Sequence, residues 1–468
     1  MSLKSIFYYS LGPVGTAFLS FATLPLITWF YSLDSVANYS VFQVLVSAVV
    51  LGLCLGLDQG YVRDYYESKY KNSLFQFCLL ISLLLFIIFT IVFVQFSEIL
   101  NGYLFSGSMT SYLVPILLVS IFINILVRYL SLSLRMEGEA LAFSISQLLP
   151  KVFFLLVILV YAFWGLDNSL QGLLLANLLS LLVVMFITIF FTRNFNLFLL
   201  EDYRFSTVSK ERLIIYSLPL VFSSLAFWGM TAADKIYLKL MSNSYELAIY
   251  SVAVSFASVG VLLQAVFSTV WAPQVYKWVN EGKAQNKIEK VTNTLTLMVM
   301  LLWALVGMGS WLAEFLLPEK YNGVSSLIIP SLAYPLLYTL SECTSVGLNV
   351  RRKTKVILFI SLVCLGVNIL LNFIFIPLYG AKGAVLASVL AFWCYFSLKT
   401  YYSFKYYVRW DYFIFWILIA LFSLLSILSM FLSQTAVVGI YSLLFAILLI
   451  KNMESVTWLL KCIKEGEF

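Results

Sequence analysis

The residues best suited to chemistry in this sequence are ionisable side chains that lie within long apolar stretches. Lys151 occupies the middle of one stretch, and the adjacent Asp234 and Lys235 occupy another, with Lys239 one helical turn further on. A charged side chain at membrane depth is costly unless it faces a protein interior or a water-filled path. A lysine ammonium in such a path can hold a phosphate group. The pattern therefore predicts that Lys151, Asp234 and Lys235 line a lumen suited to an anionic substrate. For Lys239, a side chain that reaches the membrane interface is the simpler interpretation.

Four further charged residues lie near the ends of apolar stretches. Arg128 and Glu342 occupy nearly equivalent positions in the two halves of an internal repeat, where they could contact substrate or face each other as a gate pair. Asp58 and Arg63 are five residues apart, so they do not share a helix face and could instead anchor a helix end. For all these residues the alternative role is structural: an ion pair with a neighbouring helix, or a long side chain that reaches the membrane interface.

Several kinds of site are excluded by what the sequence lacks. It contains no histidine, which rules out a His-bearing metal site, a His proton relay and the Ser/His/Asp and Cys/His triads. The six cysteines show no metal-binding spacing, and no Gly-rich phosphate cradle of the Walker type is present. These absences remove most familiar hydrolase chemistry and argue against ATP hydrolysis, and we expect no metal and no cofactor. Coupling to a proton or sodium gradient stays open, because an acidic group at membrane depth, such as Asp58, Asp234 or Glu342, can exchange protons.

The elements that hold these residues are apolar runs of membrane-spanning length. Of the 468 residues, 62% are apolar and only 11% are charged, so the core of a soluble domain could not absorb the apolar surface. Within lipid the backbone must satisfy its own hydrogen bonds, and runs of this length do so as helices. The sequence thus predicts an all-α polytopic membrane protein with fourteen transmembrane helices. The expected spans are 7–31, 39–57, 74–97, 112–134, 141–164, 169–191, 213–241, 246–271, 291–317, 324–348, 356–378, 383–401, 411–432 and 436–450.

Two internal matches divide the chain into parallel halves. The segment that begins at Gly172 aligns with the one that begins at Gly383, and the segment at Tyr39 aligns with the one at Tyr250, both at an offset of 211 residues. Because each half has six helices, both halves enter the membrane from the same side. We expect two six-helix repeats around a central cavity, followed by a helix pair. The predicted divisions are 1–191 for the first half, 192–212 for an interfacial linker, 213–405 for the second half, and 406–468 for the extra pair and tail.

Lysine and arginine are distributed unevenly between the two sets of loops. Most of the 29 lie in loops on the same side as the N-terminus, whereas the opposite loops hold only Lys320 and Lys382. Basic loops stay on the cytoplasmic side, so both termini are predicted to be cytoplasmic. The formal net charge of +7 mostly reflects this bias, and nucleic acid is not an expected partner.

Four segments carry a resemblance to a known family. They are GLDQGYVRDYY at 56–66, ADKIYL at 233–238, IYSVAVSF at 249–256 followed by FSTVWAPQVY at 267–276, and NFIFIPLYGAKGA at 372–384. Together they resemble the bacterial polysaccharide transporters, the flippases of lipid-linked O-antigen and similar repeat units. That family belongs to the multidrug, oligosaccharidyl-lipid and polysaccharide exporter superfamily. Many of its members have twelve helices, so the helix pair after Tyr407 is a departure.

The resemblance implies a transporter that makes and breaks no bonds. Its substrate would be an undecaprenyl-diphosphate-linked oligosaccharide of O-antigen, capsule or a similar polysaccharide. Alternating access would move this cargo from the cytoplasmic to the periplasmic leaflet of the bacterial inner membrane. Membrane lipids would surround the polyprenyl tail, and a polysaccharide polymerase and chain-length proteins would be partners.

Two alternatives remain open. One is a cation-coupled multidrug or metabolite antiporter of the same superfamily. The other, from a different class, is a membrane glycan polymerase or ligase, which the short outer loops disfavour.

Overall fold

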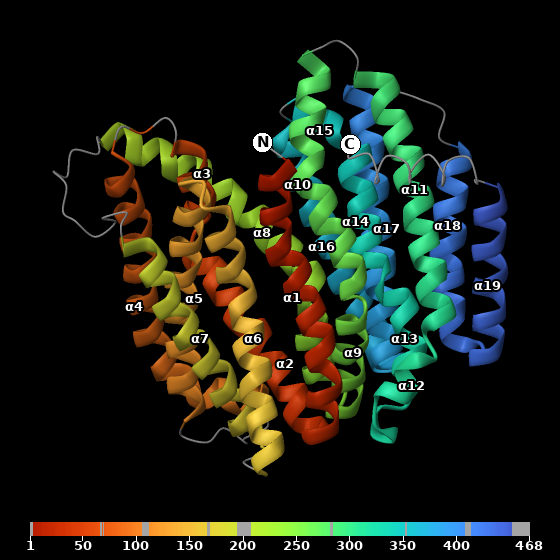
Figure 1. Ribbon diagram of the computed structural model, residues 1–468, viewed down its shortest axis with the longest axis horizontal. Coiled ribbons are helices and arrows are strands. Elements are labelled where there is room, and N and C mark those ends of the chain that lie inside the picture. The colour runs from red at the N-terminus through yellow and green to blue at the C-terminus, as the bar shows by residue number, and fades with distance from the viewer. Residues whose placement is uncertain are drawn as a thin grey trace. The chain divides into compact units, whose positions relative to one another are not determined.

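The computed structural model describes residues 3–65, 68, 70–104, 112–165, 169–193, 207–280, 284–351, 353–407 and 413–451 (Figure 1). Within these ranges every regular element is a helix, which confirms the all-α prediction. The contacts within the chain divide it into two compact units, Met1–Ser251 and Val252–Phe468. Most of the predicted linker, residues 194–206, lies outside the described ranges.

The helices follow one another with short connections. The first unit contains α1 (Leu3–Phe30), α2 (Leu33–Leu53), α3 (Leu57–Asp64), α4 (Lys71–Leu104), α5 (Leu113–Met136), α6 (Ala140–Trp164), α7 (Leu170–Thr192), α8 (Thr207–Met241) and the start of α9 (Ser244–Phe256). The second unit contains the rest of α9, then α10 (Ser258–Asn280), α11 (Ala284–Gly309), α12 (Leu312–Leu316), the 3-10 turn η2 (Glu319–Tyr321), α13 (Val324–Ser331), α14 (Ala333–Thr344), α15 (Val346–Val350), α16 (Thr354–Tyr379), α17 (Ala381–Tyr406), α18 (Phe413–Leu428), the 3-10 turn η3 (Ser429–Phe431) and α19 (Gln434–Lys451).

The described helices include enough apolar spans to make this a multi-pass membrane protein. Eleven are long and apolar enough to cross a membrane, and α9 with α10, bent by 43° between Phe256 and Ser258, brings the number to as many as twelve. Two further expected spans coincide with helices outside this count, the 35-residue α8 and the shorter apolar α18. Each of the fourteen predicted spans therefore coincides with a helix or with a broken helix.

The second predicted span, 39–57, is wrong at its C-terminal end. Helix α2 stops at Leu53, and a separate short helix, α3, begins at Leu57. Between them Leu55 and Gly56 have φ values of 45° and 65°, which no α-helix accommodates. A Cβ atom on Gly56 would also lie 2.7 Å from the carbonyl oxygen of Ser217 in α8, so this turn needs glycine for space as well as for conformation.

The predicted span 324–348 is likewise broken, into α13, α14 and α15. Pro335 explains the first break, because it has no N–H to donate to the carbonyl oxygen of Ser331, where α13 ends. The broken span is deeply buried, because 83% of its most apolar 18 residues lie inside the protein.

The same packing pattern recurs in each unit. In the first unit α5 packs against α2, α4 and α7, and α6 packs against α7. In the second unit α14 packs against α10, α11 and α17, and α16 packs against α17. Each helix pair in the first unit thus has a counterpart in the second unit at the place in the helix order that the sequence repeat predicts. Each unit therefore builds its core around the fourth span of its own half.

Helix α8 belongs to the first unit by its contacts, although the repeat places it at the start of the second half. It packs against α2, α3 and α4. Trp228 Nε1 donates to Ser47 Oγ at 3.0 Å, and Lys239 Nζ donates to Asn38 Oδ1 at 2.9 Å, so two polar contacts tie α8 to α2. The predicted division at residues 192–212 rests on the repeat and stays a prediction.

Close packing of α16 on α17 yields a testable prediction. A Cβ atom on Gly383 of α17 would lie 2.2 Å from the carbonyl oxygen of Phe375 in α16. Replacing Gly383→Ala should therefore force the helices apart at a cost of about 1–3 kcal/mol. We expect a lower melting temperature for the detergent-purified variant, measured by tryptophan fluorescence.

The matched control is Gly366→Ala in α16, where a Cβ atom would meet nothing within 4 Å. Alanine favours a helix over glycine by up to about 1 kcal/mol, so this control should be neutral or slightly stabilising. Equal melting temperatures for the two variants would contradict the packing described here.

Candidate functional site

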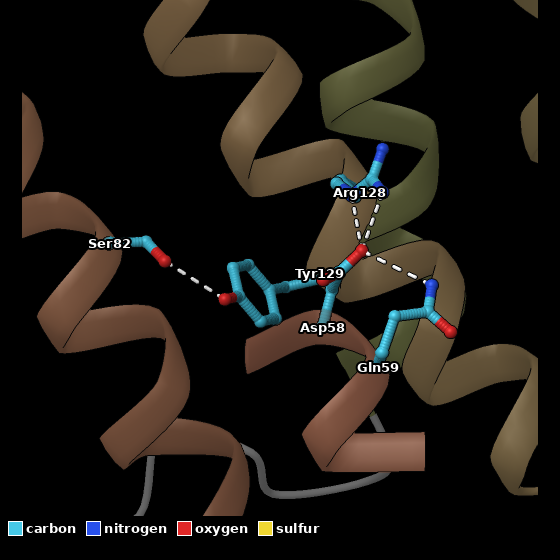
Figure 2. Close-up of polar contacts among 5 residues, drawn as sticks. All are labelled: Asp58, Gln59, Ser82, Arg128 and Tyr129. Atoms are coloured by element: carbon cyan, nitrogen blue, oxygen red, sulfur yellow. Dashed lines mark hydrogen bonds and ion pairs between the residues drawn. The ribbon is translucent and has the colours of Figure 1, made fainter. Parts of the chain in front are cut away.

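The best-defined charged contact in the first unit joins Asp58 of α3 to Arg128 of α5 (Figure 2). Arg128 Nε donates to Asp58 Oδ2 at 2.9 Å, and Nη2 of the same guanidinium donates to the same oxygen. The Asp58 side chain is 3% exposed, whereas that of Arg128 is 37% exposed. The carboxylate is therefore neutralised by a cation that still reaches solvent. This is a geometry that fits the anchoring role proposed for Asp58.

Neighbouring polar contacts fasten the same region. Tyr129, next to Arg128 in α5, shares a 2.9 Å hydrogen bond with Ser82 of α4 (Figure 2). At the end of α3, the Tyr65 hydroxyl donates to Glu137, which follows α5. Together with the ion pair, these contacts tie α3 to α5 and α5 to α4. The Arg63 side chain is 46% exposed, and its guanidinium lies 3.9 Å from the carboxylate of Asp64.

Lys151 of α6 and Lys235 of α8 are near enough for their charges to interact. The charges of the two ammonium groups repel each other, and Lys235 is also attracted by Asp234. Both lysines are half-buried, and within the described part of the chain neither makes a hydrogen bond or a salt bridge. Burying two like charges without a hydrogen-bonded anion is costly. The pair is therefore an arrangement that an anionic ligand would stabilise.

The carboxylate of Asp234 has a different environment from that of its lysine neighbour. Its side chain is fully buried, and the Tyr250 hydroxyl of α9 donates to Asp234 Oδ2 at 2.7 Å. The helical offset of one residue explains the difference, because consecutive side chains point about 100° apart. Asp234 thus faces the protein interior in this structure and not an open lumen. A role for it in binding stays a prediction.

Glu342 lies in the second unit, on α14. The Ser268 hydroxyl of α10 donates to its carboxylate, and Tyr338, one turn earlier in α14, is also hydrogen-bonded to it. Trp271 Nε1 donates to the Glu342 carbonyl oxygen at 3.2 Å. Hydroxyl groups are therefore the recorded partners of this carboxylate among the described residues. Its predicted gate contact with Arg128 would join the two units and stays a prediction.

One buried cation, Lys399, is not among the candidate residues that the sequence indicates. Lys399 of α17 is 7% exposed, and its ammonium lies over the rings of Tyr395 and Tyr338 at 4.8 and 5.7 Å from their centroids. An aromatic face attracts a cation and so offsets part of the cost of burying it. The signal was available, because Tyr395 lies four residues before Lys399 and so on the same helix face.

Comparisons with known proteins agree on family and fold. A family model described as polysaccharide biosynthesis protein matches residues 2–277. No curated protein sequence matches the chain. The structure is similar to that of the lipid II flippase MurJ in an inward closed conformation, with a TM-score of 0.69 and 14% identity over 96% of this chain and 99% of that chain.

Two further solved structures are similar. One is a MATE protein in a bent conformation, with a TM-score of 0.57 and 15% identity over 90% of this chain and 96% of that chain. The other is an inward-facing multidrug resistance MATE family transporter of the MOP superfamily, with a TM-score of 0.60 and 16% identity over 86% of this chain and 94% of that chain. At such low identities these likenesses show a shared fold.

The contact between Asp58 and Arg128 can be tested by stability measurements. Replacing Arg128→Leu leaves a buried carboxylate without its cation, a change that costs about 3–5 kcal/mol for a fully buried pair. Because the guanidinium is partly exposed, we expect the lower end of that range, read as a lower melting temperature. The double variant Asp58→Leu/Arg128→Leu should recover much of the loss.

The control is Arg63→Leu, on the short helix α3 that also holds Asp58. Replacing an exposed side chain of this kind should change the free energy of unfolding by no more than about 0.5 kcal/mol. If Arg128→Leu and the double variant melted at the same temperature, the contact would have no role in stability.

Proposed function

The chain belongs to the polysaccharide biosynthesis protein family, and from this premise we propose that it is a flippase for lipid-linked glycans. The cargo is an undecaprenyl-diphosphate-linked oligosaccharide repeat unit, such as that of O-antigen or capsule. The protein moves it from the cytoplasmic to the periplasmic leaflet of the bacterial inner membrane. Both termini face the cytoplasm, as the distribution of basic loops favours.

The observation that carries this proposal is the electrostatic repulsion between the side chains of Lys151 and Lys235. Two ammonium groups from different helices, without a hydrogen-bonded carboxylate among the described residues, lie close enough to repel each other. A diphosphate carries negative charge on both phosphoryl groups, so one anion can engage both lysines. The diphosphate that links lipid and glycan is strongly charged whatever the sugars are. The lysines are therefore suited to hold it while the glycan passes through the protein.

The fold supports the same proposal. One solved structure of similar fold is described as a lipid II flippase, and the likeness extends over nearly the whole chain. Transporters built from parallel repeats work by rocking one half against the other. Here Pro150 lies inside α6 directly before Lys151 and removes one backbone hydrogen bond there. A weakened ladder beside the binding lysine offers a place for α6 to bend during such a cycle.

A second candidate function is a cation-coupled antiporter, and Glu342 is the observation that favours it. Its carboxylate is held by hydroxyl groups rather than by a cation among the described residues. A carboxylate in such surroundings can take up a proton or a sodium ion. The same group could instead couple an ion gradient to glycan flipping.

The role of the lysines can be tested in cells. Replacing Lys151→Ala or Lys235→Ala should reduce export of surface glycan by about ten- to hundredfold, because each loses a charge-assisted contact worth about 1.5–3 kcal/mol. Lys151→Arg keeps the charge but changes its geometry, so its export should lie between that of the wild type and that of Lys151→Ala. Export is measured as surface glycan per amount of membrane-inserted protein.

The control for these variants is Lys355→Ala, an exposed lysine at the start of α16. Its export should match that of the wild type. Normal export by both Lys151→Ala and Lys235→Ala would rule out the lysines as the diphosphate site.

The energy source can be tested in liposomes. We expect purified protein to translocate a fluorescent undecaprenyl-diphosphate-linked sugar faster when a proton or sodium gradient is imposed, and Glu342→Gln to remove that acceleration while leaving passive flipping. Movement of a lipophilic cationic drug in place of the glycolipid would favour the antiporter. Equal rates with and without either gradient would exclude coupling through Glu342.

A further inference from the structure

A cavity of about 440 Å³ lies in the first unit where α2, α5 and α7 begin. Its floor is formed by four leucine and isoleucine side chains from the first turns of α5 and α7. Polar side chains from all three helix starts form the rest of the lining: Asp34, Ser35, Asn38, Tyr112, Ser169 and Gln171. The volume lies within the span of about 300–1,000 Å³ that is common for small-molecule sites. By the predicted topology, all three helices begin on the periplasmic side.

Three polar groups of this lining make no hydrogen bond within the described residues: the Asp34 carboxylate, the Gln171 side-chain amide and the Tyr112 hydroxyl. The Asp34 carboxylate is attracted by the charge of Lys239. Asn38 is only 9% exposed, and its Oδ1 accepts from Lys239 at 2.9 Å. This contact orients the Asn38 amide, because a lysine can only donate, and leaves the Nδ2 group as a donor for a ligand.

The polarity of the cavity argues against an anion. A carboxylate lines it, and the cation nearby, Lys239, is already bonded to Asn38. Helix starts can attract anions through their free N–H groups. Here Ser32 Oγ accepts from the Ser35 amide and Ser169 Oγ accepts from the Gln171 amide, both at 3.1 Å, so two of the three helix starts are capped. A divalent cation is also a poor fit, because one carboxylate over an apolar floor does not supply the six or more oxygen ligands that calcium takes.

The lining suits a sugar ring. Sugar hydroxyls both donate and accept, and the cavity offers an acceptor in Asp34, a donor in Asn38 and both in Gln171. The C–H face of a pyranose is apolar and can rest on the leucine floor or on the ring of Tyr112, which is 59% exposed. An apolar surface with a few placed polar groups is the general composition of sites for small molecules.

We propose that this cavity is a saccharide-binding site that holds a sugar residue of the glycan at the outer side of the first unit. The inference rests on the proposed function, which supplies the glycan. It adds a second contact to the diphosphate held by the lysines. A glycan bound at both places is oriented along the path and is released from the outer site last.

The test is direct binding of simple sugars to the full chain in lipid nanodiscs. The probes are the methyl glycosides of glucose, galactose, N-acetylglucosamine, N-acetylgalactosamine and rhamnose, followed by saturation-transfer NMR. We expect at least one of them to bind the wild type and to bind at least tenfold more weakly to Asp34→Asn, Gln171→Leu and Tyr112→Ala. The matched control is Tyr379→Ala, another exposed tyrosine that does not line the cavity, which should bind like the wild type.

The melting temperature of each variant shows whether a substitution lowers stability. Asp34→Asn is nearly isosteric, so its binding result can be interpreted even if a larger substitution destabilises the protein. The proposal is overturned if no glycoside binds, if the cavity variants bind as well as the wild type, or if inorganic diphosphate displaces the sugar. Because binding is measured without transport, this result is separate from that of the lysine variants. If Lys151→Ala and Lys235→Ala both export glycan normally while the cavity variants lose sugar binding, the diphosphate site is contradicted. The saccharide site is then still supported.

Discussion

The cost of placing a charge away from water is the constraint on which this structure depends. Its helices exist because a backbone in lipid must bond to itself, and their side chains are apolar for the same reason. Against that background every buried ionisable group needs a partner, a water-filled path or a ligand. The described part of the chain meets this need in different ways at different sites, and those differences separate structural charges from candidate functional ones.

Three arrangements illustrate the range. Asp58 is neutralised by Arg128, and Lys399 lies against two tyrosine rings, so these charges are balanced within the protein. Lys151 and Lys235 are close to each other and lack such a hydrogen-bonded partner. The nearby Asp234 carboxylate attracts Lys235 but can offset only one of the two positive charges. The pair is therefore the stronger candidate for contact with an anionic cargo.

Because the two units share a packing pattern, the polar contacts at equivalent positions can be compared. In each, a polar contact links the end of the second span to the fourth span: Asp58 with Arg128 in the first unit, and Ser268 with Glu342 in the second. At the repeat offset of 211, Ser268 corresponds to the residue beside Asp58, and Glu342 falls within one turn of the position equivalent to Arg128. The two units thus share a packing pattern but carry different charged side chains at these equivalent positions. An ion pair in one half corresponds to a carboxylate with hydroxyl partners in the other.

The amino-acid sequence by itself determined the all-α class, the positions of the membrane spans, the internal repeat and the places where charges enter apolar helices. These are local properties, because lipid acts on each segment separately through length and hydropathy. Only the tertiary structure decided which charges meet. Asp58 and Arg128 are 70 residues apart, and α8 packs on the first unit although the repeat assigns it to the second half.

The break at Gly56 and the cavity at three helix starts also required the folded chain, since both depend on contacts between distant segments. A helix that is apolar all round has no polar face to indicate which side packs and which faces lipid. For that reason the sequence located Lys151 and Lys235 on their helices, whereas only the folded chain brings their charges within range of each other.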